Sequence, residues 1–231
     1  MSTLLGNPLW FATRATGSVA LVLLTATVAL GIVAGGRYAP SSVGRFEVAT
    51  LHRNLSLLCL ALLAVHIGTA LADSYVPLGW ISGLVPFASP YRTLWVGLGT
   101  VAFDLLLAVA LSSAVRLRIG ARRWKATHWL AYAAWPVAVF HAAGTGTDTK
   151  LGAQAALYVL CGAAVLPACW WRLYNAGPGH VATRATAAVL SVGLPLAFYA
   201  FMLSGPLAPG WSHRAQDLRD PVAAITIGGR R

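Results

Sequence analysis

The sequence predicts an all-α integral membrane protein, built as a bundle of six transmembrane helices. Of its 231 residues, 58% are hydrophobic and only 10% are charged, whereas a soluble domain carries about 25% charged residues. The apolar residues gather in six long runs, and a helix needs about 20 residues to cross a bilayer. The net charge is +11, but the basic residues lie at the ends of these runs and between them. That pattern is typical of membrane topology and not of nucleic-acid binding.

Glycine and proline separate the apolar runs and so define the order of the predicted elements. The six spans are expected at 17–35, 48–72, 93–115, 126–144, 153–171 and 185–204. We expect residues 1–16 to form an N-terminal interfacial segment, 17–204 the transmembrane domain, and 205–231 a polar C-terminal tail. Residues 75–91 (YVPLGWISGLVPFASPY) are too short and too broken by proline to span, so they predict an interfacial or re-entrant element.

Lysine and arginine set the expected orientation. The connection 116–125 (RLRIGARRWK) contains five basic residues and no acid, and the connections 37–53 and 172–184 are also basic. Because basic loops remain in the cytoplasm, these three connections are expected there and both termini outside. Asp73 and Asp148 fall in the outer connections, where we expect solvated loop acids.

The cysteines predict packing and no metal chemistry. Cys59, Cys161 and Cys169 all lie in apolar runs, their number is odd, and no Cys-x-x-Cys occurs. This argues against a disulfide framework, a zinc site or an iron–sulfur cluster. We expect small, buried packing residues.

Four histidines lie inside the apolar runs, two in the second span and two in the fourth. LHRNLSLLCLALLAVH contains His52 and His66, and HWLAYAAWPVAVFH contains His128 and His141. The rise along a helix separates the first two by about 21 Å and the second two by about 20 Å. Because the two spans run in the same direction, the histidines form two layers, with His52 and His128 at the cytoplasmic level.

Two imidazoles facing each other in a bundle can hold a haem between them. The fold predicted here is therefore a six-helix bundle with haems between helices two and four. The angular positions of the histidines in the fourth span fit this arrangement less well. Thirteen residues leave His128 and His141 roughly 140° apart around an ideal helix, so they would not both face the second span. Pro136 lies between them and is expected to kink or rewind the helix.

Other interpretations of these histidines stay open. They could pack or form interhelical hydrogen bonds in a non-haem scaffold, or they could form a proton relay in a transporter. A relay would usually need more carboxylates, and only Asp104 lies clearly inside a span. A zinc site is disfavoured, because pairs about 20 Å apart cannot share one ion. His180 and His213 lie in a loop and in the tail and are expected to be solvated.

The paired-histidine spans resemble the ferric reductase transmembrane domain family, and within it actinobacterial members. This family includes the haem-b membrane parts of NADPH oxidases and ferric-chelate reductases, and the haem subunit of bacterial methionine sulfoxide reductase. The resemblance covers about residues 9 to 172. It rests on LWFATRATGSVALVLLTATVALGI (9–32), LHRNLSLL (51–58), RRWKATHW (122–129) and HWLAYAAWPVAVFHAAGTGTDT (128–149). Respiratory cytochrome b uses a similar four-histidine core, so a quinol-linked cytochrome b is an alternative.

The resemblance implies two haems b, an inner one on His52 and His128 and an outer one on His66 and His141. It also implies stepwise electron transfer between the faces of a bacterial plasma membrane. In the oxidases a flavin and nicotinamide domain follows the last span. Residues 205–231 are too few for such a domain, so we expect a redox subunit with a separate flavoprotein or other electron donor. The terminal acceptor, and whether the chain itself is an enzyme, stay open.

Further candidates surround these sites. Arg53, Arg122, Arg123 and Lys125 lie at the inner level, where each could pair with a haem propionate or simply set the topology. Asp104 could accept the second ring N–H of a ligand histidine, or lie on a proton path. Four aromatic residues could line the haem edges or face lipid: Trp129, Tyr132, Trp135 and Phe140. The string Gly97-Leu-Gly99-Thr-Val-Ala102 lies inside an apolar run, so its glycines predict close packing against a helix or haem face and no nucleotide site.

Overall fold

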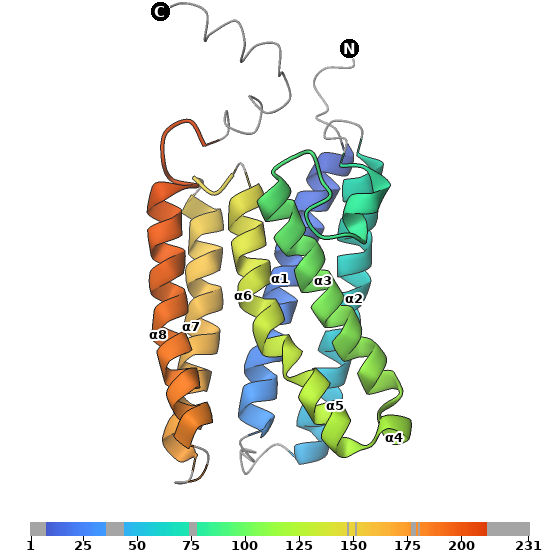
Figure 1. Cartoon of the computed structure of the whole chain (residues 1–231), viewed down its shortest axis with the longest axis vertical. Helices are drawn as coiled ribbons and strands as arrows, with labels where there is room; N and C mark the ends of the chain where they lie inside the picture. The colour runs from blue at the N-terminus through green and yellow to red at the C-terminus, as the bar shows by residue number, and fades with distance from the viewer. Residues whose placement is uncertain are drawn as a thin grey trace, which may run out of the picture.

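The protein is a bundle of long helices with a few short elements at its ends (Figure 1). The computed structural model describes residues 8–35, 44–73, 78–146, 148–150, 152–176, 179 and 181–211, and within these ranges it contains no strand. The helices are α1 (Pro8–Gly35), α2 (Arg45–Ala72), α3 (Thr93–Ala114), α4 (Arg116–Ile119), α5 (Ala121–His128), α6 (Leu130–Thr145), α7 (Gly152–Asn175) and α8 (Val181–Ser204), with a 3₁₀ helix η1 at Trp80–Gly83. The expected all-helical class is confirmed for this part of the chain.

Successive long helices run in opposite directions (Figure 1). The tightest packing joins α1 to α2 and α3 to α6, while α7 packs on α1 and α8 lies outermost against α7. The short helices α4 and α5 lie at the same end of the bundle as the start of α2. The helices α2 and α6 therefore run in the same direction, as the two-layer arrangement requires.

Within the described part of the chain, five helices are long and apolar enough to cross a membrane: α1, α2 (counted from Phe46), α3, α7 and α8. The expected span at 126–144 instead divides between α5 and α6, with Trp129 between them, and α6 has only 16 residues. This length is below the roughly 20 residues that a perpendicular span needs. The chain is thus a multi-helix membrane protein, and the sixth span remains a prediction.

The first helix begins earlier than expected. Proline is favoured at the first helical position, because its missing N–H would have no partner there, and α1 starts at Pro8. Residues 8–16, which we assigned to an interfacial segment, are therefore the first turns of α1. At the other end, the expected boundary at 204 agrees with the last residue of α8; residues 212–231 of the predicted tail lie outside the described residues.

The core lies mainly around α1. One cluster joins Leu24, Val28 and Ile32 of α1 to Cys59 and Val165. A second cluster contains Leu21, Val139, Ala143, Tyr158, Cys161 and Met202. Cys59 and Cys161 are buried and Cys169 half-buried, and all three are free thiols, which confirms the packing role. The helices α2 and α8 present mostly exposed apolar side chains, as helices in contact with lipid do.

The connection between α2 and α3 folds against the outer ends of both helices. The Thr100 hydroxyl donates to the Ser82 carbonyl (2.7 Å), and Ser82 is buried. A Cβ added at Gly97 would collide with Phe87, and one added at Gly83 would collide with Leu71. These contacts agree with the predicted interfacial or re-entrant element, of which residues 75–77 lie outside the described residues.

Candidate functional site

The structure brings the four intramembrane histidines together in two pairs. His52 on α2 faces His128 at the end of α5, with ring centroids 6.2 Å apart and ring planes 61° apart. His66 on α2 faces His141 on α6, with ring centroids 6.3 Å apart and ring planes 77° apart. We call these the inner pair and the outer pair, following the orientation expected from the basic loops.

A break in the helix next to His128 allows both His128 and His141 to face α2, although they would point in different directions on one regular helix. Helix α5 ends at His128, and α6 begins at Leu130. The Tyr132 N–H donates to the Trp129 carbonyl (3.0 Å), a bond across three residues that tightens the turn. His128 and His141 thus lie on two helices, with Pro136 inside α6, and need not follow one regular helical phase.

The spacing within each pair fits two axial ligands of one iron. A histidine nitrogen lies about 2.0 Å from a bound metal, so two imidazoles on opposite faces of one ion have ring centroids roughly 6 Å apart. Among the described residues, no group of three or more His, Cys, Asp or Glu side chains is placed to hold a metal ion. Each pair supplies only two ligands, so an ion held there would take its remaining ligands from outside these histidines. A haem, with four pyrrole nitrogens, fits this requirement.

The outer pair is fixed by two backbone hydrogen bonds. The Nδ1 of His66 lies 2.8 Å from the Thr13 carbonyl oxygen, and the Nδ1 of His141 lies 2.8 Å from the Trp95 carbonyl oxygen. A carbonyl only accepts, so in the neutral ring the proton is on Nδ1 and the lone pair is on Nε2. Such a bond fixes the ring and makes it a more basic ligand.

The inner pair is held differently. The Nδ1 atoms of His52 and His128 are buried and have no hydrogen-bond partner among the described residues. Trp124 on α5 stacks against His128, with ring centroids 5.2 Å apart, and its Nε1–H donates to the Ser113 hydroxyl (3.2 Å). The inner rings are therefore positioned by packing more than by hydrogen bonds.

The other predicted site residues lie around these pairs without converging on them. Arg53 and Arg123 are exposed at the inner end, as are Arg122 and Lys125. Asp104 is half-buried on α3. The outer histidines already donate from Nδ1 to backbone carbonyls, which leaves Asp104 no such role there. A cofactor role for Arg53, Arg123 and Asp104 stays a prediction.

The four aromatic candidates separate into different environments. The Trp135 indole lies inside the bundle, and its Nε1–H donates to the Thr25 hydroxyl of α1 (2.9 Å). Trp129 and Tyr132 are exposed and contact each other edge-on. Phe140 packs edge-on against Phe198 of α8. Of the four, only Trp135 lies between the two layers in the core.

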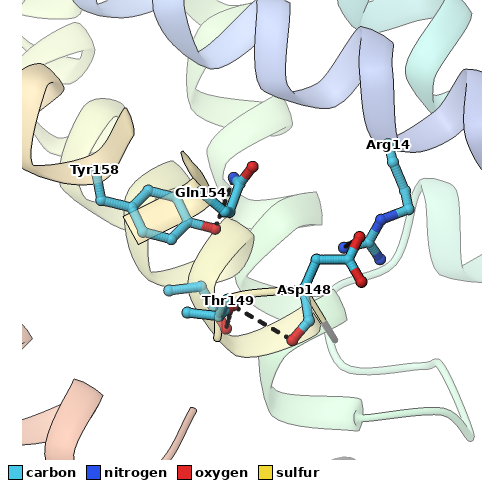
Figure 2. Close-up of polar contacts among 7 residues, drawn as sticks. Arg14, Asp148, Thr149, Gln154 and Tyr158 are labelled. Atoms are coloured by element: carbon cyan, nitrogen blue, oxygen red, sulfur yellow. Dashed lines mark hydrogen bonds and ion pairs between the residues drawn. The ribbon is translucent and has the colours of Figure 1, made fainter. Parts of the chain in front are cut away.

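Three charged residues at the outer end have structural contacts that the sequence did not predict. Asp73 is buried, and Asp148 forms an ion pair with Arg14 of α1 (Figure 2). The expectation of a solvated loop acid is therefore wrong for Asp73, because the outer loops fold back onto the helix ends, whereas Asp148 stays partly exposed. Near that pair, the Gln154 side-chain amide donates to the Tyr158 hydroxyl (3.1 Å).

The third is Arg92, which is buried. It donates to the Gly144 carbonyl and to the Trp211 carbonyl (3.1 Å). It thereby joins the start of α3 to the end of α6 and to the segment after α8. Its backbone has a positive φ of 42°, which a sequence pattern does not reveal.

Comparison with known families gives a match that covers most of the predicted site. The family model described as "Ferric reductase like transmembrane component" matches residues 16–139. This range includes His52, His66 and His128 and stops shortly before His141. Comparison with curated proteins gives no significant match, and neither does comparison with solved structures. The matched family indicates a role in membrane electron transfer. Because the match covers more than half of the chain, this protein belongs to the ferric reductase-like transmembrane component family.

Proposed function

We propose that this protein is a di-haem b electron-transfer subunit of a bacterial plasma membrane. The inner pair would hold one haem and the outer pair the other, each through two imidazoles. The observation that carries the proposal is the match between the two pairs, whose centroid separations are 6.2 and 6.3 Å. A bound haem supplies one-electron chemistry, since its iron cycles between the ferric and ferrous states.

The residues of the chain have three tasks in this function. The histidines bind and orient the cofactor. The apolar side chains of α1 and α6, with Trp135 and Cys59 between the layers, exclude water from the space between the two sites. The segment from η1 to Arg92 and the segment 205–211 pack over the outer end. A dry, closed site of this kind raises the influence of each nearby charge on a reduction potential.

The decisive test is the haem content of the purified protein. We expect the pyridine haemochrome assay to give near two haems b per chain, with the reduced spectrum of low-spin haem. A protein that folds stably without haem would refute the proposal and favour the transporter or scaffold. Changes in haem reduction caused by quinone-site inhibitors would instead favour a quinol-linked cytochrome b.

We also propose that an acidic electron-donor protein docks at the inner end. Five basic side chains on α4 and α5 are exposed there: Arg116, Arg118, Arg122, Arg123 and Lys125. None of them has an ion pair among the described residues. Opposite charge accelerates the encounter of two proteins. Directly behind this surface, Trp124 stacks on His128, so a docked donor would lie close to the inner pair.

The orientation of this basic surface is testable on its own. Because the connection 116–125 has five basic residues and no acid, we expect it to face the cytoplasm. A cysteine introduced at Arg118 should resist membrane-impermeant thiol reagents in intact cells and react after permeabilisation. A cysteine at Lys150, which is exposed at the opposite end, is the matched control and should react in intact cells. The reverse labelling pattern would invert the assigned direction.

A further inference from the structure

Three of the four histidine rings contact a glycine of a neighbouring helix. A Cβ built on Gly17 of α1 would lie 2.8 Å from Cε1 of His66, and one on Gly99 of α3 would lie 2.5 Å from Cε1 of His141. A Cβ built on Gly31 of α1 would lie 3.2 Å from Cε1 of His52. Real Cβ contacts essentially never fall below 3.0 Å, so the outer rings occupy space that any other residue would fill.

The two outer rings also hydrogen bond to the carbonyl four residues before the glycine. His66 bonds to Thr13, four residues before Gly17. In an α-helix each Cα–Cβ bond tilts toward the N-terminus, so a side chain covers the turn before its own Cα. A glycine therefore uncovers the carbonyl of the preceding turn. That oxygen has two lone pairs, so it can accept the helical N–H and an imidazole N–H together.

The arrangement repeats at His141 and, less completely, at His52. His141 bonds to Trp95, four residues before Gly99. His52 lies against Gly31, which follows Thr27 by four residues, but its Nδ1 completes no hydrogen bond among the described residues. We call each carbonyl with its following glycine a glycine notch; the three notches are Thr13/Gly17, Thr27/Gly31 and Trp95/Gly99.

The fourth ring has no notch. On α3, Ser112 and Ser113 lie where the helix contacts α5, because Ser113 bonds to Trp124, which packs on His128. The Ser112 hydroxyl donates to the Val109 carbonyl (3.0 Å), which is the carbonyl four residues before Ser113. The Ser113 hydroxyl in turn accepts from Trp124. The Ser113 side chain fills the space that a glycine would leave open, and the His128 Nδ1 has no partner among the described residues.

We propose that Gly17 and Gly99 are positioning residues that orient the two outer haem ligands by exposing a backbone carbonyl to the imidazole, and that Gly31 positions His52 by leaving room for its ring against α1. Position 113, a serine, offers His128 neither of these supports. This inference rests on the proposed haem function. It assigns these glycines to individual layers, Gly17 and Gly99 to the outer pair and Gly31 to the inner pair.

The test is the haem content of single alanine variants, resolved by layer. His66→Ala and His52→Ala identify the redox signals of the outer and inner haems. We expect Gly17→Ala and Gly99→Ala to weaken retention of the outer haem by about 10- to 100-fold, as the loss of partners around metal ligands typically does. The inner signal should remain. Gly31→Ala should affect the inner haem and spare the outer one.

Two matched controls separate ligand positioning from the general cost of replacing glycine. Gly162 on α7 and Gly193 on α8 are helical, and a Cβ at either position meets nothing within 4 Å. Gly162→Ala and Gly193→Ala should keep both haems and the wild-type thermal midpoint. If the notch variants retain both haems, or lose them without regard to layer, the inference is overturned. A wild-type protein without haem would instead refute the proposed function.

A complementary variant covers the case in which the alanine variants fail to fold. Ser112→Ala combined with Ser113→Gly frees the Val109 carbonyl and creates a fourth notch. A hydrogen bond from the His128 Nδ1 would make that ligand more basic and stabilise ferric iron. We expect a lower reduction potential for the inner haem and slower loss of that haem to apomyoglobin, with the outer haem unchanged. An inner haem unaltered in both measurements would contradict the notch mechanism.

Discussion

The inner and outer histidine pairs have nearly the same separation but different supports. Both outer rings donate to helix carbonyls through Nδ1, whereas both inner Nδ1 atoms are buried without a partner among the described residues. The outer pair also lies beneath folded loops, while the inner pair adjoins an exposed basic surface. In the proposed function, the equal spacing lets both pairs bind a haem in the same way, while the different supports make the outer site more rigid and the inner site more accessible.

The largest expected effect comes from removing one ligand from each pair. His52→Ala should abolish the inner haem and lose about half of the haem absorbance, while dithionite still reduces the outer haem. Reduction by a cytoplasmic donor should slow strongly, because the electron would have to cross about 20 Å in one step. Stopped-flow spectroscopy of vesicles measures this rate.

His66→Ala is the matched comparison for that experiment. The inner haem should still accept electrons from the donor, while delivery to an outside acceptor fails. If His52→Ala left donor-driven reduction of the outer haem intact, electrons would enter from the outer face instead. The outer pair, and not the inner pair, would then be the site that accepts electrons from the donor.

The second effect concerns Arg92, which supports the outer end. Arg92→Met keeps the length of the side chain but removes the donors to the Gly144 and Trp211 carbonyls. Hydrogen bonds from charged donors contribute about 1.5–3 kcal/mol each, so the free energy of unfolding should fall by several kcal/mol. Thermal unfolding in detergent measures this loss. The control is Arg118→Met at an exposed position of α4; an equal loss there would show that the outer end has no special dependence on Arg92.

The third effect tests access to the inner pair. Arg122→Glu combined with Arg123→Glu should slow reduction by an acidic donor by about tenfold or more at low salt. The difference from wild type should shrink as salt screens the charges. Lys150→Glu makes the same kind of change at the opposite end and should leave the rate unchanged. Equal slowing by both variants would argue against docking on α4 and α5.

The smallest effect is expected at the ion pair between Arg14 and Asp148. Both side chains are partly exposed, at 25% and 33%, and such pairs contribute about 0–1 kcal/mol. Asp148→Asn should therefore shift the thermal midpoint only slightly and leave the haem spectrum unchanged. A loss as large as that of Arg92→Met would place this pair in a water-excluded site and make the outer end more rigid than proposed here.

Much of this arrangement follows from the sequence, because membrane helices reveal themselves by long apolar runs. The four histidines also stand out, since ionisable residues are rare in such runs. The boundary of α1 was missed because its first turns include Arg14 and several small polar residues. The break at Trp129 was missed because neither glycine nor proline marks it.

The supports of the site were harder to predict than the ligands. Gly99 was expected in a close contact, but its partner, His141, becomes visible only when α3 and α6 are placed together. The burial of Asp73 and Arg92 depends on how the outer loops fold back over the bundle. Hydrogen bonds to backbone carbonyls leave no mark in the sequence of the acceptor, except where a glycine follows four residues later.

The equal spacing on α1 and α2 also limits how the protein can move. Gly17 and Gly31 are 14 residues apart, as are His52 and His66, and the two helices are antiparallel neighbours. Sliding one helix along the other by a single turn, about 5.4 Å, would take both rings out of their notches at once. Sliding of α1 along α2 would therefore disrupt the contacts of both His52 and His66, so the two helices should behave as one rigid body. Opening between this body and the α3–α6 unit would then change the distance between the paired imidazoles in both layers together.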